Sequence, residues 1–187
     1  RAESELSRFN AYTGLDWFPV SAELCQLVAE ALTLGAATDG AFDVTVGPLV
    51  NLWGFGPDAP VAAPPDAARV DALLAQTGYT GLHTDCVANA LRKDRGGLYV
   101  DLSAYAKGYG VDAVAGLLEE GGATRYLVEI GGEMRVAGLN ARDEPWAVAI
   151  ESPVRDDRTV HAVIRVSDAA VATSGDYRNY FEHDGRF

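Results

Sequence analysis

The sequence predicts a mixed α/β fold of the α+β kind, with largely antiparallel sheets and helices packed on them. Segments with helical spacing of apolar residues all precede residue 120, and strand-like runs gather in the second half of the chain. Strands that follow helices in a block, instead of alternating with them, favour an antiparallel sheet. At 187 residues, 48% of them hydrophobic, we expect one domain over residues 1–187 with a core of its own.

Helix starts are marked by residues whose side chains can accept a hydrogen bond from the first free backbone N–H groups. Ser21, Asp66 and Ser103 each precede an apolar pattern of helical period. A short helical turn is also expected at a Pro-Leu-Val sequence. The predicted helices span residues 22–36, 48–53, 66–76 and 104–119.

Strands are predicted where β-branched and aromatic residues are enriched or alternate with polar residues. Val160–Val166 shows this period of two most clearly. The predicted strands span residues 98–102, 126–130, 134–138, 146–150, 160–166, 170–173 and 177–183.

Charge and cysteine content limit the possible partners. The formal net charge is −12, which argues against nucleic acid and anionic membrane surfaces, and no apolar run reaches the ~18 residues of a membrane span. Of the two cysteines, Cys25 lies in an apolar helix pattern and is predicted to be a buried thiol. Nothing in the spacing calls for a disulfide or a metal site. The first residue is not Met, and the last follows a strand-like run, so we expect a chain truncated at both ends.

Two segments of the first 112 residues carry candidate binding groups. In Thr38–Pro48, Asp39 and Asp43 bracket a Gly-Ala-Phe turn, where they either accept hydrogen bonds from a ligand or stabilise their own loop. In Tyr99–Asp112, Lys107 lies in the first turns of a predicted helix, a place that attracts anions. The glycines at 108 and 110 suggest a close approach by backbone or ligand, and the alternative is helix packing with a solvated lysine.

Two further segments are compatible with plain turns. Glu129–Arg135 has a Gly-Gly pair between strand-like runs, which is a common hairpin connection. Ala172–Tyr180 gathers hydroxyl groups, an aspartate, an arginine and aromatic residues around one glycine. No histidine lies in a recognisable nucleophile motif, so a hydrolase triad is not supported.

Taken in order, these segments resemble the ApbE family, the FAD:protein FMN transferases. Any one motif is weak, but six in the family's order are specific and extend over nearly the whole chain. The matching stretches are Ser4–Asn10, Thr38–Leu49, Asn51–Gly56, Asp101–Tyr109, Glu129–Glu133 and Thr173–Arg178.

The resemblance implies a tunnelling-fold-like architecture with FAD in a cleft, and Mg²⁺ as the metal. The implied reaction joins FMN to a Thr or Ser hydroxyl of an acceptor flavoprotein through a phosphoester and releases AMP. The implied acceptors are subunits of membrane redox complexes. Family members also lead us to expect a bacterial periplasmic location, with an inner-membrane lipid anchor.

The resemblance also assigns residues by motif position. It implies FAD contacts for Asn10, Ala41, Phe42, Asp43, Asp101 and Lys107. Ser174, Gly175 and Tyr177 would border the same cleft, and the backbone carbonyl of Ala104 would be a metal ligand. Together these predict that the turn at 41–43 and the helix start at 104–107 converge on the paired phosphates.

The chain departs from the family pattern near its last residue. Relatives carry a His-x-x-Asp-Pro motif and an Asp-x-x-x-Thr/Ser segment, and this sequence contains neither. The expected catalytic histidine and the side-chain metal ligands would therefore lie beyond Phe187. Two other functions stay open: an FAD pyrophosphatase that uses water as acceptor, and an FAD-binding module without chemistry.

Overall fold

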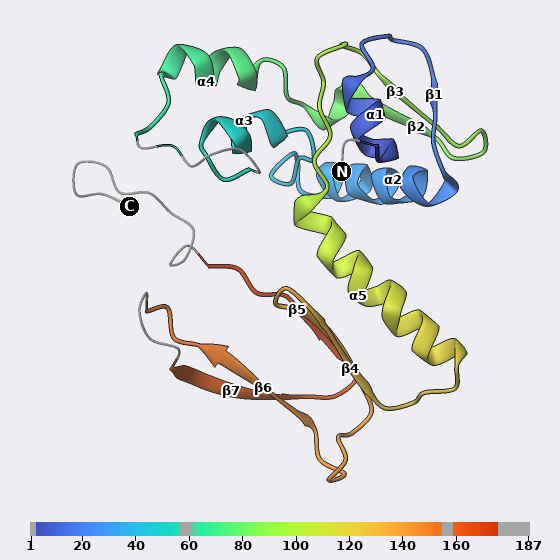
Figure 1. Ribbon diagram of the computed structural model, residues 1–187, viewed down its shortest axis with the longest axis vertical. Coiled ribbons are helices and arrows are strands. Elements are labelled where there is room, and N and C mark those ends of the chain that lie inside the picture. The colour runs from blue at the N-terminus through green and yellow to red at the C-terminus, as the bar shows by residue number, and fades with distance from the viewer. Residues whose placement is uncertain (1–2, 57–60, 62, 155–158, 176–187) are drawn as a thin grey trace. The chain divides into compact units, whose positions relative to one another are not determined.

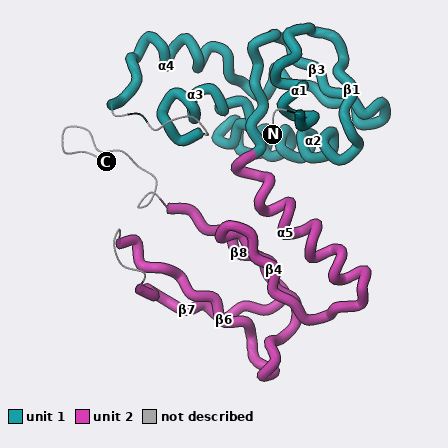
Figure 2. Tube along the Cα trace, in the orientation of Figure 1, with its two compact units in different colours: residues 1–102, 181–187 teal, residues 103–180 magenta. Residues whose placement is uncertain are grey.

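The computed structural model describes residues 3–56, 61, 63–154 and 159–175 (Figure 1). These residues form two compact units, one within residues 1–102 and the other within residues 103–180 (Figure 2). Each unit is described by itself. The expectation of a single domain over 1–187 stays a prediction, and the strand predicted at 177–183 lies outside the described residues.

The helices of the first unit begin where their capping residues predict. Ser21 Oγ accepts a hydrogen bond from Leu24 N at 3.1 Å, and Asp66 Oδ1 accepts one from Ala68 N at 2.9 Å. A first helix that the periodicity analysis did not predict follows Ser4, which caps it in the same way. The helices are α1 (Glu5–Ala11), α2 (Ala22–Ala37), α3 (Gly47–Leu52) and α4 (Ala67–Leu74).

A small antiparallel sheet in the order β1-β3-β2 accompanies these helices. Its strands are β1 (Phe18–Pro19), β2 (Leu82–Asp85) and β3 (Ala90–Lys93), with a 3₁₀ turn at Tyr79–Gly81 before β2. None of these strands was predicted, because segments of two to four residues are too short to show a period.

The strand prediction for 98–102 is wrong, although its apolar residues do enter the core. Leu98, Val100 and Leu102 are buried and pack with residues of α1 and α2. The backbone of Val100 pairs with the side-chain amide of Asn10 instead of a neighbouring strand. The apolar run at 98–102 therefore indicated correctly that these residues are buried, but not that they form a strand.

The prediction of a free thiol at Cys25 is also wrong. Cys25 is fully buried as expected, but its sulfur is bonded to that of Cys86 in the turn between β2 and β3. The two cysteines are 61 positions apart, with Cα atoms 5.6 Å from each other. Their pairing depends on the fold bringing α2 against that turn, which spacing in the sequence does not reveal.

The second unit consists of a long helix and antiparallel strands. Val111 and Ala115 of α5 (Ser103–Glu120) are buried against Tyr126 and Val128 of β4. Every strand pair among the described residues is antiparallel, which confirms the predicted fold class. The strands are β4 (Tyr126–Ile130), β5 (Glu133–Ala137), β6 (Trp146–Glu151), β7 (Val160–Val166) and β8 (Ala169–Val171), paired as β4-β5-β8 and β6-β7.

None of the described helices is both long and apolar enough to cross a membrane.

Candidate functional site

Asp43 is fully engaged by groups of its own unit. Its Oδ1 accepts hydrogen bonds from the backbone N and the hydroxyl of Thr45, at 2.8 and 2.7 Å. Its Oδ2 accepts one from Tyr79 N at 3.0 Å, and Thr45 Oγ1 accepts one from Gly78 N at 2.7 Å. Asp43 thus fastens the 38–48 loop to the 78–79 turn, which is the structural role open to a carboxylate here. Its contact with FAD stays a prediction.

The remaining predicted residues of this loop are also held in place by the protein. Thr38 Oγ1 accepts from Phe42 N at 3.1 Å and donates to Leu34 O at 2.9 Å, which ties the loop to the end of α2. The Phe42 side chain is half-buried against the core of the unit. Ala41 is exposed. The loop is thus preorganised, with the backbone around Ala41 on its accessible side.

Asn10 and Asp101 lie on neighbouring segments of the first unit. Asn10 Nδ2 donates to Val100 O and its Oδ1 accepts from Val100 N, both at 2.8 Å. Asp101 N donates to Val44 O at 2.7 Å, next to Asp43. Three predicted FAD contacts, Asn10, Asp43 and Asp101, therefore lie on neighbouring segments of one unit, joined by the side-chain amide of Asn10 at Val100 and by a backbone hydrogen bond from Asp101 to Val44.

In the second unit, Lys107 projects from the start of α5 toward the β4–β5 turn. Its Nζ donates to Gly131 O at 3.2 Å and to Glu133 Oε1 at 3.0 Å. The Lys107 side chain is 46% exposed, so solvent reaches the ammonium group despite this pair. Ala104, three residues earlier in the helix, is exposed as well.

The Gly-Gly pair forms the hairpin turn that its sequence predicts. Gly131 and Gly132 have φ values of +57° and +93°, in the region that glycine adopts without strain. Glu129 Oε1 accepts from Gly132 N at 2.7 Å, and Thr173 Oγ1 donates to Gly132 O at 3.1 Å. A Cβ at position 132 would lie 2.7 Å from that hydroxyl oxygen. The turn thus brings the third and fourth motifs together.

Three motifs that are far apart in the sequence meet here: the start of α5, the β4–β5 turn and the segment after β8. Ser174 and Gly175 follow directly after Thr173 and are exposed. Tyr177 lies outside the described residues. Of the two helix glycines, a Cβ at Gly110 would approach Ile130 Cδ1 to 3.3 Å, whereas one at Gly108 would meet no described atom within 4 Å.

The predicted convergence of the 41–43 turn with the 104–107 helix start stays a prediction. The first segment belongs to the unit within residues 1–102, and the second to the unit within residues 103–180.

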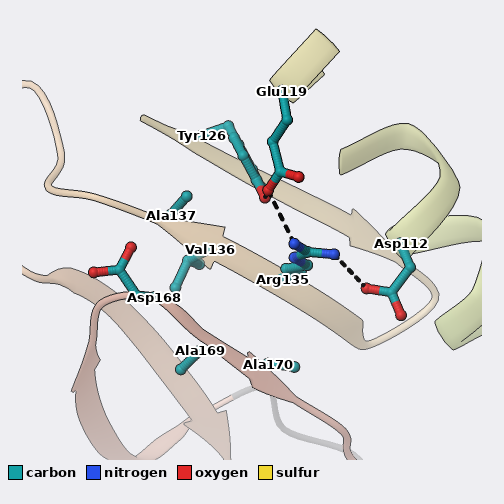
Figure 3. Close-up of a pocket in the computed structure, with 9 residues that line it drawn as sticks. All are labelled: Asp112, Glu119, Tyr126, Arg135, Val136, Ala137, Asp168, Ala169 and Ala170. Atoms are coloured by element: carbon teal, nitrogen blue, oxygen red, sulfur yellow. Dashed lines mark hydrogen bonds and ion pairs between the residues drawn. The ribbon is translucent and has the colours of Figure 1, made fainter. Parts of the chain in front are cut away.

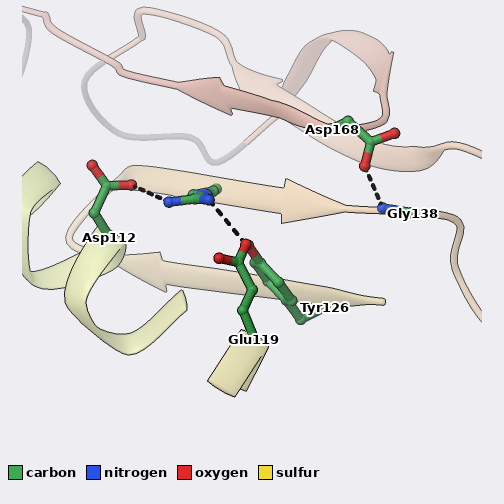
Figure 4. Close-up of polar contacts among 6 residues, drawn as sticks. Asp112, Glu119, Tyr126, Gly138 and Asp168 are labelled. Atoms are coloured by element: carbon green, nitrogen blue, oxygen red, sulfur yellow. Dashed lines mark hydrogen bonds and ion pairs between the residues drawn. The ribbon is translucent and has the colours of Figure 1, made fainter. Parts of the chain in front are cut away.

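The second unit also contains a hollow of about 310 Å³ (Figure 3). Arg135 lies between two carboxylates of α5: it donates to Asp112 at 3.1 Å and to Glu119 at 2.9 Å (Figure 4). Glu119 also accepts a hydrogen bond from Tyr126, and this contact raises the pKa of the Tyr126 hydroxyl. The hollow is at the small end of ligand pockets, and no predicted site residue lines it. We do not assign it a dinucleotide.

Metal-binding groups do not cluster in the described residues: no set of three or more His, Cys, Asp or Glu side chains is placed to bind one ion. The proposed ligand at Ala104 is a single backbone oxygen, whereas Mg²⁺ takes six oxygen ligands in near-octahedral geometry. The described part of the chain does not form a magnesium site.

Three residues of this arrangement were not predicted from the sequence. Thr45 and Thr173 lie within the noted motifs, but hydroxyl-to-backbone contacts across 33 and 41 positions leave no local signal. Lys93 is buried in β3, and because that strand is itself too short to be predicted, no pattern in the sequence indicated that this lysine is buried.

The chain is similar to proteins of one known family. The family model described as "ApbE family" matches residues 1–187. The chain is 53% identical over 185 residues to a FAD:protein FMN transferase of Vibrio cholerae, covering 99% of this chain and 55% of that protein. It is 45% identical over 188 residues to the enzyme of the same name from Salmonella typhimurium, covering 98% and 53%. The chain spans about half the length of these curated relatives.

Solved structures agree with the fold. The flavin transferase ApbE from Vibrio cholerae superimposes with a TM-score of 0.86 at 50% identity, covering 98% of this chain and 59% of that one. An ApbE protein from Thermotoga maritima gives a TM-score of 0.85 at 32% identity, covering 97% and 58%.

Proposed function

Because this chain belongs to the ApbE family, we propose that it acts in FAD:protein FMN transfer, moving FMN from FAD to a Thr or Ser hydroxyl of an acceptor protein. The observation that carries the proposal is the meeting of three motifs in one unit, where Lys107 and Thr173 both bond the Gly131–Gly132 turn. This places an exposed ammonium group beside an exposed hydroxyl-rich segment.

The proposed reaction is a phosphoryl substitution. The acceptor hydroxyl oxygen attacks the FMN-side phosphorus of the pyrophosphate and forms a new P–O bond. The bridging P–O bond breaks, AMP leaves with its electron pair, and the hydroxyl proton passes to a base. Such reactions depend mainly on positioning and on stabilising charge at the phosphates.

The exposed residues of the second unit are suited to the anionic part of FAD. The pyrophosphate enters a protein of net charge −12, so a local cation is needed to offset repulsion. Lys107 supplies that charge near the start of α5, where the first backbone N–H groups also favour anions. Glu133 orients the ammonium group of Lys107 and at the same time partly neutralises its positive charge.

The predicted site residues of the first unit, whose polar groups bond the protein, have a different role in the proposal. Both carboxylate oxygens of Asp43 accept hydrogen bonds from the protein and so hold the loop in shape. In the proposal, the backbone near Ala41 and the half-buried Phe42 in this loop contact FAD. In the proposal, Asn10 and Asp101 contact FAD beside this loop.

Magnesium dependence belongs to the proposal through the family resemblance. When bound, Mg²⁺ would offset charge on the pyrophosphate. Of the ligands that the resemblance implies, only the Ala104 carbonyl lies among the described residues, and we therefore derive no step through the ion.

For location and partners we propose a bacterial periplasmic protein with an inner-membrane lipid anchor, acting on flavoprotein subunits of membrane redox complexes. The disulfide between Cys25 and Cys86 supports an exported protein, because disulfides persist in oxidising compartments. Alkylation of cell-derived protein before and after reduction tests this: thiols that react only after reduction are expected. Thiols that are free in cells would contradict an oxidising location.

The transfer is tested by mixing the protein with FAD, MgCl₂ and an acceptor carrying one candidate Thr, with a Thr→Val acceptor as control. Intact-mass spectrometry should show the acceptor heavier by one FMN less water, with one AMP released per adduct. Omitting Mg²⁺ or adding chelator should abolish the adduct.

Other outcomes identify the competing functions. AMP and free FMN released at the same rate without acceptor would indicate a pyrophosphatase. Tight, chelator-insensitive FAD binding with FAD recovered intact would indicate a binding module without chemistry.

A further inference from the structure

Lys93 is a buried cation that the proposed chemistry does not use. Its side chain leaves β3 toward the core and the residue is 1% exposed. The Nζ donates to three backbone carbonyls, Phe9 O at 3.1 Å, Leu98 O at 3.2 Å and Asn10 O at 3.4 Å. It also lies 5.0 Å from the centroid of the Phe9 ring. No carboxylate among the described residues forms an ion pair with it.

Burying a lysine without a carboxylate partner is unfavourable, so other contacts must compensate the buried charge of Lys93. Desolvation lowers the pKa of Lys93 below its ordinary value. The three carbonyls account for its three N–H donors. Two of these carbonyls, Phe9 O and Asn10 O, belong to the last turn of α1, where carbonyls lack the i+4 donors of a helix interior. Phe9 O also accepts a hydrogen bond from Tyr12 N at 3.2 Å.

The third carbonyl belongs to a different segment. Leu98 lies two residues before Val100, whose backbone N and O both bond the Asn10 side chain. Lys93 therefore bonds both of the segments that Asn10 joins, on the core side of the junction. From Val100 the chain continues directly into Asp101, whose N bonds Val44 O beside Asp43.

We propose that Lys93 is a positioning residue for FAD binding: its ammonium group fixes the end of α1 against segment 98–100 and thereby orients Asn10 and Asp101. The inference rests on the proposed function for the statement that these two residues meet FAD. At 1% exposure Lys93 itself has no access to a ligand.

The test compares three variants of the intact chain. Lys93→Met fills nearly the same volume without charge or donors, and Lys93→Gln keeps an amide donor. Val28→Ala is the matched control, because Val28 is fully buried in the same core but is not bonded to Lys93 or Asn10. Two quantities are measured under conditions where each variant is folded: hydrogen exchange at the Val100 amide and the Kd for FAD.

We expect Lys93→Met to accelerate exchange at Val100 and to raise the Kd for FAD about tenfold, with Lys93→Gln in between and Val28→Ala close to wild type in Kd. In an Asn10→Ala background, the effect of Lys93→Met on Kd should largely disappear, because it acts through that side chain. If Lys93→Met does not fold, the same readouts on Lys93→Gln decide.

An unchanged Kd in a folded Lys93 variant, or an equal rise in Val28→Ala, would overturn the inference. Failure of the proposed function looks different: wild-type protein would form no FMN adduct on the acceptor, or would bind no FAD at all, while the exchange effect of Lys93→Met at Val100 would persist.

Discussion

The loop around Asp43 and the turn around Gly131–Gly132 differ in what their polar groups are bonded to. In the first, every carboxylate oxygen of Asp43 accepts from a protein donor, and Thr45 beneath it is 1% exposed. In the second, Lys107 is 46% exposed, and Ser174 and Gly175 lie in solvent. Motif residues of one family thus divide into some whose polar groups bond the protein and others that stay accessible to solvent.

This difference also separates two sources of stability. The Asp43 loop lies in a unit fastened by a disulfide, a buried lysine and buried hydroxyl contacts. The Gly131–Gly132 turn lies in a unit whose described ion pairs each have at least one well-exposed side chain. Exposed pairs contribute little to folding, typically about 0–1 kcal/mol. Substitutions that remove these buried contacts in the first unit should therefore lower stability, whereas substitutions of exposed groups at the turn should change stability little.

The largest effect is expected from Cys86→Ser. Cys86 is exposed, so the variant removes the cross-link across 61 positions without burying a new polar group. Loss of loop-closure entropy predicts a free energy of unfolding lower by about 4 kcal/mol, measured by urea denaturation without reductant. Reductant should lower wild type to the same value and leave Cys86→Ser unchanged. A variant as stable as oxidised wild type would show that the cross-link does not stabilise the first unit.

A smaller effect is expected from Thr45→Val. The substitution is nearly isosteric, but it leaves Gly78 N and one acceptor position of Asp43 without their hydroxyl partner. The free energy of unfolding should fall by about 2 kcal/mol in chemical denaturation. Thr45→Ser keeps the hydroxyl and should lose only about 1 kcal/mol for the missing methyl group. Equal losses in both variants would mean that packing, not the Asp43–Thr45 contact, stabilises the loop.

The smallest stability effect, with a distinct binding effect, is expected from Lys107→Gln. Stability should change by about 1 kcal/mol or less, because the Lys107 side chain is 46% exposed, although its partner Glu133 is only 17% exposed. The Kd for FAD should rise about tenfold, with a weaker dependence on salt, since one charge facing the pyrophosphate is lost. Arg125→Gln removes a comparable exposed pair with Asp143 and serves as the control. Equal Kd values in the two variants would exclude Lys107 from phosphate binding.

Local signals in the sequence predicted local structure. Ser21 and Asp66 marked helix starts through contacts two or three residues away, and the Gly-Gly pair predicted its own hairpin. The strand over Val160–Val166 was predicted to the residue. Failures came where the partner was distant: the apolar run at 98–102 pairs with an asparagine 90 positions away, and its pattern alone indicated a strand.

By itself the sequence determined the family, the mixed fold class and most helices and hairpins, because these depend on ordered motifs and on contacts within a few residues. Only the tertiary structure decided that Cys25 is cross-linked, that Asp43 bonds its own unit and that Lys93 is buried against three carbonyls. Each of these includes a contact between groups 36 to 84 positions apart, and such proximity is a property of the packed chain.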